Sequence, residues 1–187
     1  MAQMTPLAGQ TVLVTGATGF VGGALTLQLA RDGVRVRALA RSPEKGAFLR
    51  QSDHAHLIEI VLGDVTDADR MHEVAAGCAV VFHVAAALRG PYADQRRVNV
   101  DGTRHVVQAA ADGGARRIVH ISSVAVYGYG HRADVCEDTP PRPVHDPYVR
   151  SKREGERVVR DVGAERGLSY CILRPGAIYG PRSGFWT

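Results

Sequence analysis

The sequence is poor in the features that mark secreted, metal-binding and membrane-spanning proteins. Its 187 residues contain three cysteines, widely spaced and without a CxxC pair, a pattern that gives neither a disulfide framework nor a zinc site. No apolar run approaches the roughly 20 residues that a membrane-spanning helix needs. The first residues also lack the basic and apolar regions of a secretory signal. We therefore expect a cytoplasmic protein with reduced thiols, no bound metal and no membrane partner.

Lysine is also scarce, because only Lys45 and Lys152 among the 23 basic residues are lysines. The formal net charge of +4 is modest for this length, and the arginines of residues 150–157 alternate with acidic residues. Such mixing is typical of a solvated helix face rather than of a nucleic-acid-binding patch. We expect no nucleic acid among the partners.

Apolar runs rich in β-branched residues alternate with longer stretches of helical periodicity. Strands are expected at Thr11–Thr15, Val34–Ala40, Leu57–Leu62, Val80–His83, Arg117–Ser122 and Ser169–Leu173. Helices are expected at Phe20–Asp32, Pro43–Arg50, Ala68–Ala76, Asp94–Ala111 and Pro147–Arg166. Strands without polar alternation predict parallel pairing with burial on both faces. The predicted fold class is α/β, a doubly wound parallel sheet (a Rossmann fold) with helices on both faces, in one domain over 1–187.

One segment, Tyr129–Asp146, interrupts this alternation. It is rich in proline and charge and too long for a tight turn. Connections of that length are commonly functional. We expect it to overhang the site.

A glycine-rich turn follows the first strand directly and opens the first helix. Residues 15–22 read TGATGFVG, with Gly16, Gly19 and Gly22 at GxxGxxG spacing. Without Cβ atoms the backbone can turn tightly and let a pyrophosphate reach the helix N-terminus, where free N–H groups and the helix dipole favour negative charge. An ordinary glycine-rich turn is the alternative, but the position between strand and helix favours a dinucleotide site.

The end of the second strand bears on the choice of cofactor. A carboxylate there would accept a hydrogen bond from the ribose 2′-hydroxyl of NAD. The strand end carries no acidic residue, and Arg41 and Lys45 follow it. Since arginine's planar fork suits phosphate oxygens, we expect NADP as the preferred cofactor, with NAD as the alternative. Stacking of Arg41 on adenine, or simple exposure, is the competing interpretation.

Tyr148 and Lys152 stand four residues apart at the start of a predicted helix, hence on one helical face. A tyrosine with its ordinary pKa of about 10 is a poor base at neutral pH. Lowering that pKa by about three units needs roughly 4 kcal/mol, and an ammonium about 4 Å away supplies a similar amount at an effective dielectric near 20. Lys152 is therefore a chemically sufficient partner for Tyr148.

A serine pair ends the fifth predicted strand, in the sequence HISSVAVYG of residues 120–128. The carboxyl end of a parallel strand is where open α/β sheets bind ligands. A serine hydroxyl at this place strengthens the interpretation of Tyr148 and Lys152 as a catalytic pair.

These motifs together resemble the extended short-chain dehydrogenases/reductases, the NAD(P)-dependent epimerase/dehydratase family. The resemblance rests on TGATGFVG, the Gly-Asp-Val of residues 63–65, HVAA at 83–86, ISSVAVYG, YVRSK and RPGAIYGP at 174–181, in that order along nearly the whole chain. It implies that the pyrophosphate would be held by Gly16, Gly19, Phe20, Val21 and Gly22. It further implies cofactor contacts from Asp64, Val65, Ala85, Ala86, Tyr148, Lys152, Pro175 and Ile178. The catalytic residues would be Ser123, Tyr148 and Lys152, with Tyr148 as general acid/base, and Asn99 would be structural.

The sequence departs from that family pattern in two places. Dehydratases of the family carry an Asp-Glu pair where Val124 and Ala125 stand here, which disfavours dehydration. Family members also continue well past the RPGAIYGP segment, whereas this chain has its last residue at Thr187. We therefore expect the C-terminal substrate-binding region to be largely absent.

Three functions remain open at this point. The first is an NADP-linked oxidoreductase that interconverts a carbonyl and a secondary alcohol of a small-molecule substrate, as in the reductase branch of the family. The second is an NAD-dependent sugar-nucleotide epimerase with the same residues. The third is a dinucleotide-binding module, or truncated remnant, without catalysis. By resemblance alone, the helices at Asp94–Ala111 and Pro147–Arg166 would pair two copies in a homodimer.

Overall fold

A single parallel sheet organises the computed structural model, which describes residues 7–130 and 134–183. Its six strands lie in the order β3-β2-β1-β4-β5-β6. The strands are β1 (Thr11–Thr15), β2 (Arg35–Ala40), β3 (Ile58–Leu62), β4 (Val80–His83), β5 (Arg117–Ile121) and β6 (Ser169–Leu173). The order runs outward in both directions from β1 and β4, which is the doubly wound arrangement that the sequence predicts.

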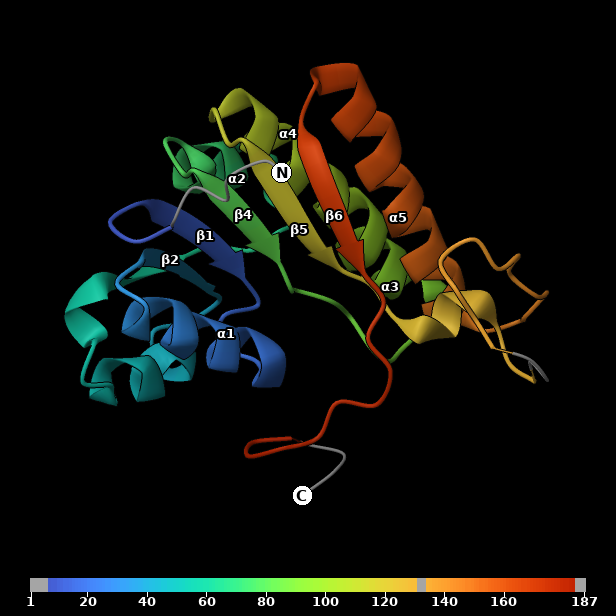
Figure 1. Ribbon diagram of the computed structural model, residues 1–187, viewed down its shortest axis with the longest axis horizontal. Helices are drawn as coiled ribbons and strands as arrows, with labels where there is room; N and C mark the ends of the chain where they lie inside the picture. The colour runs from blue at the N-terminus through green and yellow to red at the C-terminus, as the bar shows by residue number, and fades with distance from the viewer. Residues whose placement is uncertain (1–6, 131–133, 184–187) are drawn as a thin grey trace.

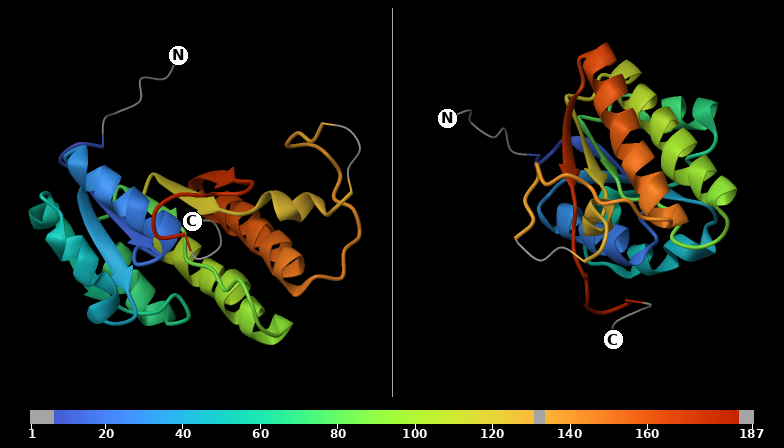
Figure 2. Two further views of the ribbon diagram at one scale, coloured as in Figure 1. Left: turned by 90° about the horizontal axis from the view of Figure 1, so that it is seen from below. Right: turned by 90° about the vertical axis from the view of Figure 1, so that its right-hand side faces the viewer.

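Helices cover both faces of this sheet, as Figures 1 and 2 show. The α-helices are α1 (Phe20–Arg31), α2 (Ala68–Ala75), α3 (Tyr92–Arg96), α4 (Gly102–Asp112) and α5 (Pro147–Arg166). The other helical segments, which are 3-10 or π helices, are η1 (Glu44–Gln51), η2 (Ala55–Leu57), η3 (Arg97–Asp101) and η4 (Val124–Tyr127). Helices α2, α4 and α5 share one face, and α1 with η1 lies on the other. The predicted α/β fold with helices on both faces is confirmed.

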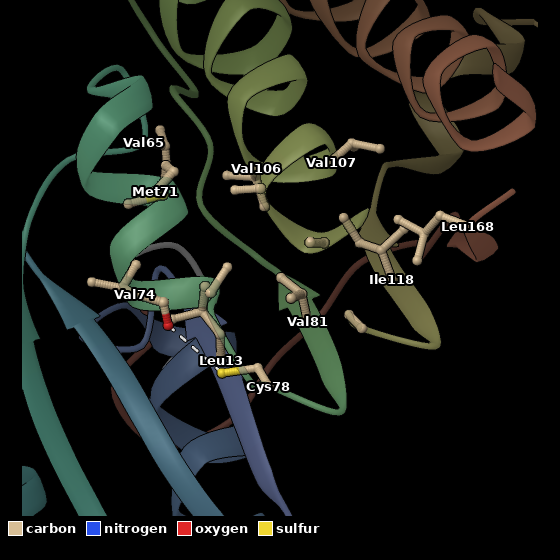
Figure 3. Close-up of a cluster of buried hydrophobic side chains, with 14 of the residues drawn as sticks. Leu13, Val65, Met71, Val74, Cys78, Val81, Val106, Val107, Ile118 and Leu168 are labelled. Carbon is tan, nitrogen blue, oxygen red and sulfur yellow. Dashed lines mark hydrogen bonds between the residues drawn. The ribbon is translucent and has the colours of Figure 1, made fainter. Parts of the chain in front are cut away.

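Two hydrophobic clusters hold these layers together. Figure 3 shows the larger one, where Leu13, Val81 and Ile118 of the sheet meet Met71 of α2 and Val106 of α4. A smaller cluster packs α1 and η1 against the opposite face of β1 and β2. Because adjacent strand residues point to opposite faces, each central strand feeds both clusters, which explains its unbroken apolar sequence.

The helix expected at Asp94–Ala111 is longer and less regular than predicted. Helical backbone runs without a break from Tyr92 to Asp112, but its middle turn, η3, is a π-helix. A Cβ on Gly155 of α5 would lie 2.5 Å from the carbonyl oxygen of Asn99 in that turn. Helix α5 therefore approaches the π turn as closely as backbone allows, and π turns of this kind often mark functional sites.

The short helix expected at Pro43–Arg50 is present within a residue of those bounds, as the 3-10 helix η1. Its tighter winding brings Gly46 against the sheet, where a Cβ would lie 2.9 Å from Ile60 Cδ1. The segment from Tyr129 to Asp146 forms neither helix nor strand in its described residues. Over the described part of the chain, no helix is long and apolar enough to cross a membrane.

Candidate active site

A cleft of about 520 Å³ opens at the carboxyl ends of the strands. It extends over the β1–β4 boundary, where the strand order reverses and doubly wound folds bind their ligands. Of the residues predicted to act there, the cleft is lined by Gly16, Gly19, Phe20, Val21, Gly22, Arg41, Asp64, Val65, Ala85, Ala86, Ser123, Tyr148, Lys152, Pro175 and Ile178. Residues that lie far apart in the sequence thus meet in one cavity.

The glycine-rich turn has no room for side chains at two positions. Gly16 has φ +68°, and a Cβ there would lie 2.7 Å from the backbone nitrogen of Ala85. At Gly22, a Cβ would lie 2.1 Å from the carbonyl oxygen of Gly16. Gly19 is the N-cap of α1. Because glycine has no side chain, the first N–H groups of that helix have no side-chain cap. This arrangement fits a pyrophosphate at the N-terminus of α1.

The adenosine end of the cleft carries one of the two predicted cationic groups. Arg41 follows β2 and lines the cleft, whereas Lys45 is exposed on the first turn of η1 and does not. Asp64 is fixed after β3 because its Oδ1 accepts hydrogen bonds from the backbone nitrogen of Thr66 at 2.9 Å and from its hydroxyl at 2.8 Å. Of these two cationic residues, Arg41 alone lines the cleft.

The other end of the cleft is formed by the segment after β5 and the start of α5. Asp146 caps this helix, its Oδ1 accepting from the backbone nitrogens of Tyr148 at 2.7 Å and Val149 at 3.2 Å. The Ser123 hydroxyl caps η4 by accepting from the backbone nitrogen of Ala125 at 3.2 Å. Both predicted hydroxyl groups therefore stand on capped turns that fix their position.

The Tyr148 phenol is not activated by the chain's own groups. Burial raises its pKa above the ordinary value, the nearby Ser123 hydroxyl offsets part of that effect, and Tyr129 and Asp146 add to the rise. Lys152 is not among the described groups that act on it. The expected depression of the Tyr148 pKa by Lys152 is thus not present in the chain on its own.

Lys152 lines the cleft but is almost fully buried. Its Nζ donates a hydrogen bond of 2.6 Å to the carbonyl oxygen of Ile121 at the end of β5. Only 2% of the residue is exposed, and burial lowers the pKa of the ammonium to about 8, against the opposing influence of Glu156. The bond to Ile121 uses one of the three donors of the ammonium, so two remain for other groups in the cleft.

A buried hydrogen-bond network below the cleft was not expected from the sequence. His83 ends β4 with no exposed surface; its Nδ1 lies 2.8 Å from Thr15 Oγ1 and its Nε2 lies 2.9 Å from Thr103 Oγ1. Because Thr15 Oγ1 already accepts from the backbone nitrogens of Val84 and Ala85, its proton goes to Nδ1. His83 therefore carries its own proton on Nε2 and donates to Thr103.

Asn99 extends this network to both sides of the cleft. Its side chain exchanges two hydrogen bonds with the backbone of Ala87, at 2.7 and 2.8 Å, and donates to Ser151 Oγ at 2.9 Å. The loop after β4 is thereby tied to α5, the helix of Tyr148 and Lys152. The structural role expected for Asn99 agrees with these contacts.

The sequence reasoning also missed several lining residues. The cleft includes Thr18, Leu39, Gly63, Val84, Ala87, Leu88, Val98, Ile121, Ser122 and Gly176. Most are direct neighbours of predicted residues, so their position at strand ends was the available signal. Within the described part of the chain, no group of three His, Cys, Asp or Glu residues could hold a metal ion.

The fold and the residues gathered in the cleft define a dinucleotide-binding domain of the short-chain dehydrogenase/reductase type. More particularly, the chain belongs to the NAD dependent epimerase/dehydratase family, whose model matches residues 12–186. The ceramide reductase of Caulobacter vibrioides is 36% identical over 171 residues, which are 91% of this chain and 47% of that protein. Cinnamoyl-CoA reductase 1 of Oryza sativa subsp. japonica is 33% identical over 189 residues, 92% of this chain and 54% of that protein.

A solved structure adds the same information on the fold. A short-chain dehydrogenase/reductase superfamily protein of Agrobacterium tumefaciens with bound NAD superimposes with a TM-score of 0.76 at 31% identity, covering 88% of this chain and 48% of that one. The chain spans about half the length of the curated relatives it matches.

Proposed function

We propose that this chain carries the cofactor site and the catalytic residues of an NAD(P)-dependent oxidoreductase that interconverts a carbonyl and a secondary alcohol. The observation that carries the proposal is the presence of Ser123, Tyr148 and Lys152 in the cleft that the glycine-rich turn also lines. It is supported by relatives that are named as reductases and that align with this chain over about half of their length.

In this proposal each side chain has a distinct task. Bound nicotinamide supplies or accepts the hydride. The Tyr148 phenol moves the proton to or from the substrate oxygen, and the Ser123 hydroxyl holds that oxygen by a hydrogen bond. Lys152 binds the cofactor ribose through its remaining donors and lowers the Tyr148 pKa by its charge. The burial of Tyr148 makes this help necessary, because burial alone raises its pKa.

NADP is the proposed cofactor. Arg41 lines the cleft at the end of β2, where no carboxylate competes with a 2′-phosphate. A neighbour that binds NAD belongs to the same superfamily, so the proposal rests on Arg41 and not on the fold. The substrate would be a small molecule, and a cytoplasmic location and a homodimer through α4 and α5 complete the proposal.

Titration calorimetry of the whole chain with NADPH and with NADH tests the cofactor assignment. We expect saturable binding with NADPH ahead, and a roughly 10- to 100-fold loss of NADPH affinity in Arg41→Ala, because a charge-assisted hydrogen bond contributes about 1.5–3 kcal/mol. The control Arg50→Ala, on the exposed last turn of η1, should bind as the unchanged chain does. Tighter binding of NADH than of NADPH by the unchanged chain would exclude the NADP preference, and an undiminished NADPH affinity in Arg41→Ala would remove Arg41 from the phosphate site.

Tyr148→Phe tests the catalytic assignment. We expect NADPH affinity to persist and carbonyl reduction to fall by about 10²- to 10⁴-fold, since the phenol moves the proton but the ring still packs. Ketones and aldehydes related to the substrates of the reductase relatives are the panel to assay. Turnover that survives this substitution would remove Tyr148 from the chemistry. If the unchanged chain itself binds NADPH but turns over none of the panel, the non-catalytic module is favoured.

A further inference from the structure

A polar cluster that the proposed reaction does not use lies buried beneath Lys152. His120 lies in β5 and Ser122 directly follows the strand. Because strand residues two apart point to the same face, both point with Ile118 toward α5. On α5, Lys152 and Glu156 stand one turn apart. All four polar residues are buried, and His120 has only 1% of its surface exposed.

Hydrogen bonding in this cluster is incomplete within the described residues. Neither ring nitrogen of His120 has a partner there, although the ring is almost inaccessible. The buried Ser122 hydroxyl approaches the Glu156 carboxylate without forming a well-aligned hydrogen bond. Buried polar atoms are bonded in the great majority of native structures, and each one left without a partner costs about 1–3 kcal/mol.

The neighbouring histidine shows that the lack of hydrogen-bond partners is confined to this cluster. The rings of His83 and His120 lie 5.1 Å apart on adjacent strands, and both nitrogens of His83 are bonded. Lys152 also lacks partners, because its ammonium has three donors and, among the described acceptors, only the Ile121 carbonyl takes one of them. Donors and acceptors without partners therefore face one another between β5 and α5.

A water molecule has the donors and acceptors that this cluster requires. Buried waters typically make about three hydrogen bonds to groups that would otherwise lack partners. Ile121, Ser122 and Lys152 all line the cleft, so the cluster is continuous with a cavity that water enters. We propose that His120 is a positioning residue for Lys152: with Ser122 it binds a buried water that hydrates the ammonium from below.

This water would keep Lys152 charged while it is buried. The titratable and charged groups around it are His83 on β4, His120 on β5, Tyr148, Glu156 and Arg160 on α5, and Arg174 after β6. Glu156 is held by Arg174 and Arg160, and both histidines are neutral because burial and the Lys152 charge lower their pKa. Glu156 offsets part of the desolvation of Lys152, and water can offset more of it.

The scarcity of lysine makes a direct measurement available. The chain labelled with ¹³C at lysine Cε gives resonances from Lys45 and Lys152 alone, and Lys45→Arg assigns them. In the unchanged chain Lys152 should titrate near its pKa of about 8. In His120→Phe, which fills the site without hydrogen-bonding groups, we expect that pKa to fall by about one unit, since dry burial disfavours the charged form.

Three further variants separate hydration from packing. His120→Gln keeps a side chain that can bond water, and should leave the Lys152 pKa within a few tenths of the unchanged value. Thr26→Val removes another buried, unpartnered hydroxyl, from α1 on the other face of the sheet, and should change nothing. Ser122→Ala removes the second water ligand, and should lower the Lys152 pKa by less than His120→Phe does.

Two outcomes of the titrations would overturn the inference. An unchanged Lys152 pKa in folded His120→Phe, or an equal fall in His120→Gln, would show that His120 acts by volume or not at all. Should His120→Phe not fold, Ser122→Ala decides the question, and an unshifted Lys152 in that variant rejects the water. None of these readouts needs substrate or turnover, so the inference stands or fails apart from the proposed function.

Discussion

Single residues show most clearly how burial sets the chemistry of this molecule. His83 has no exposed surface, and burial together with the Lys152 charge lowers its pKa to about 3. Its two hydrogen bonds, to Thr15 and Thr103, use the neutral ring. A proton on His83 would break the bond from Thr15 and place a charge beside Lys152. The network beneath the cleft therefore depends on His83 staying neutral.

Acid should consequently destabilise the chain through His83. Between pH about 6.5 and about 3 the unfolded chain holds a proton that the folded chain lacks, so stability falls as pH falls in this window. From pH 7.5 to pH 5 this single group should remove about 2 kcal/mol of unfolding free energy. His120, whose pKa burial also lowers, acts in the same direction.

Urea unfolding at pH 7.5 and pH 5 measures the effect. His83→Gln should be less stable than the unchanged chain at pH 7.5, but should lose about 2 kcal/mol less on going to pH 5. The exposed His56 supplies the control, since His56→Gln should keep the full acid loss. If His83→Gln lost as much stability as the unchanged chain, His83 would not be the acid-sensitive group.

The sequence predicted residues better than their contacts. The cleft lining could be inferred for Gly16, Asp64 and Ser123 because each follows a strand, and parallel strands end at a common edge. It failed for Lys45, which the winding of η1 turns outward. Lys152 does line the cleft, but its bond to the Ile121 carbonyl had no signal, since helical spacing does not say which acceptor a long side chain reaches.

At the scale of elements, the start of α5 is the most consequential turn of the chain. Asp146 binds two of its first backbone nitrogens, and Tyr148 follows within the same turn. Further along, Glu156 receives two hydrogen bonds of 2.8 Å from Arg174, which ties α5 to the segment after β6. The helix is thus fixed at its cap and at its middle, and the Tyr148 phenol lies between.

Removing the cap should weaken this helix. In Asp146→Ala the backbone nitrogens of Tyr148 and Val149 lose their acceptor, at a cost of about 1 kcal/mol. For a chain of this size that corresponds to a fall of about 2–4 °C in the unfolding temperature. Asp146→Asn keeps a capping oxygen and should restore most of the loss, although it removes the charge. Equal unfolding temperatures for the Ala and Asn variants would mean that the cap contributes nothing measurable.

Element boundaries followed the sequence pattern, whereas irregular geometry did not. The strands lie within a residue or so of their predicted bounds, because β-branched apolar runs have sharp ends at glycine or polar residues. The π turn of η3 had no local signal, since it depends on Gly155 of a distant helix packing against Asn99. The periodicity of apolar residues in the sequence cannot predict such tertiary adjustments.

In the molecule as a whole, helices cover the two faces of the sheet unevenly. Helices α2, α4 and α5 protect one face of the sheet along β1, β4, β5 and β6, while α1 and η1 protect the other only over its first half. In Figure 1 no helix lies in front of β5 and β6. On this open side Leu173 is 48% exposed, beside half-buried Cys171, and β6 is an edge strand.

This open side should make the 187-residue chain associate with itself in a concentration-dependent way. A sheet edge with apolar side chains beside it offers backbone groups and apolar surface to a second copy, which favours association. Leu173→Lys places a charge on this side and should lower the associated fraction seen by light scattering at tens of micromolar. Leu62, 46% exposed at the end of the opposite edge strand β3, is the matched control. If Leu62→Lys reduced association as much as Leu173→Lys, general charge rather than the open sheet face would govern it, and the uneven cover of the sheet would have no consequence in solution.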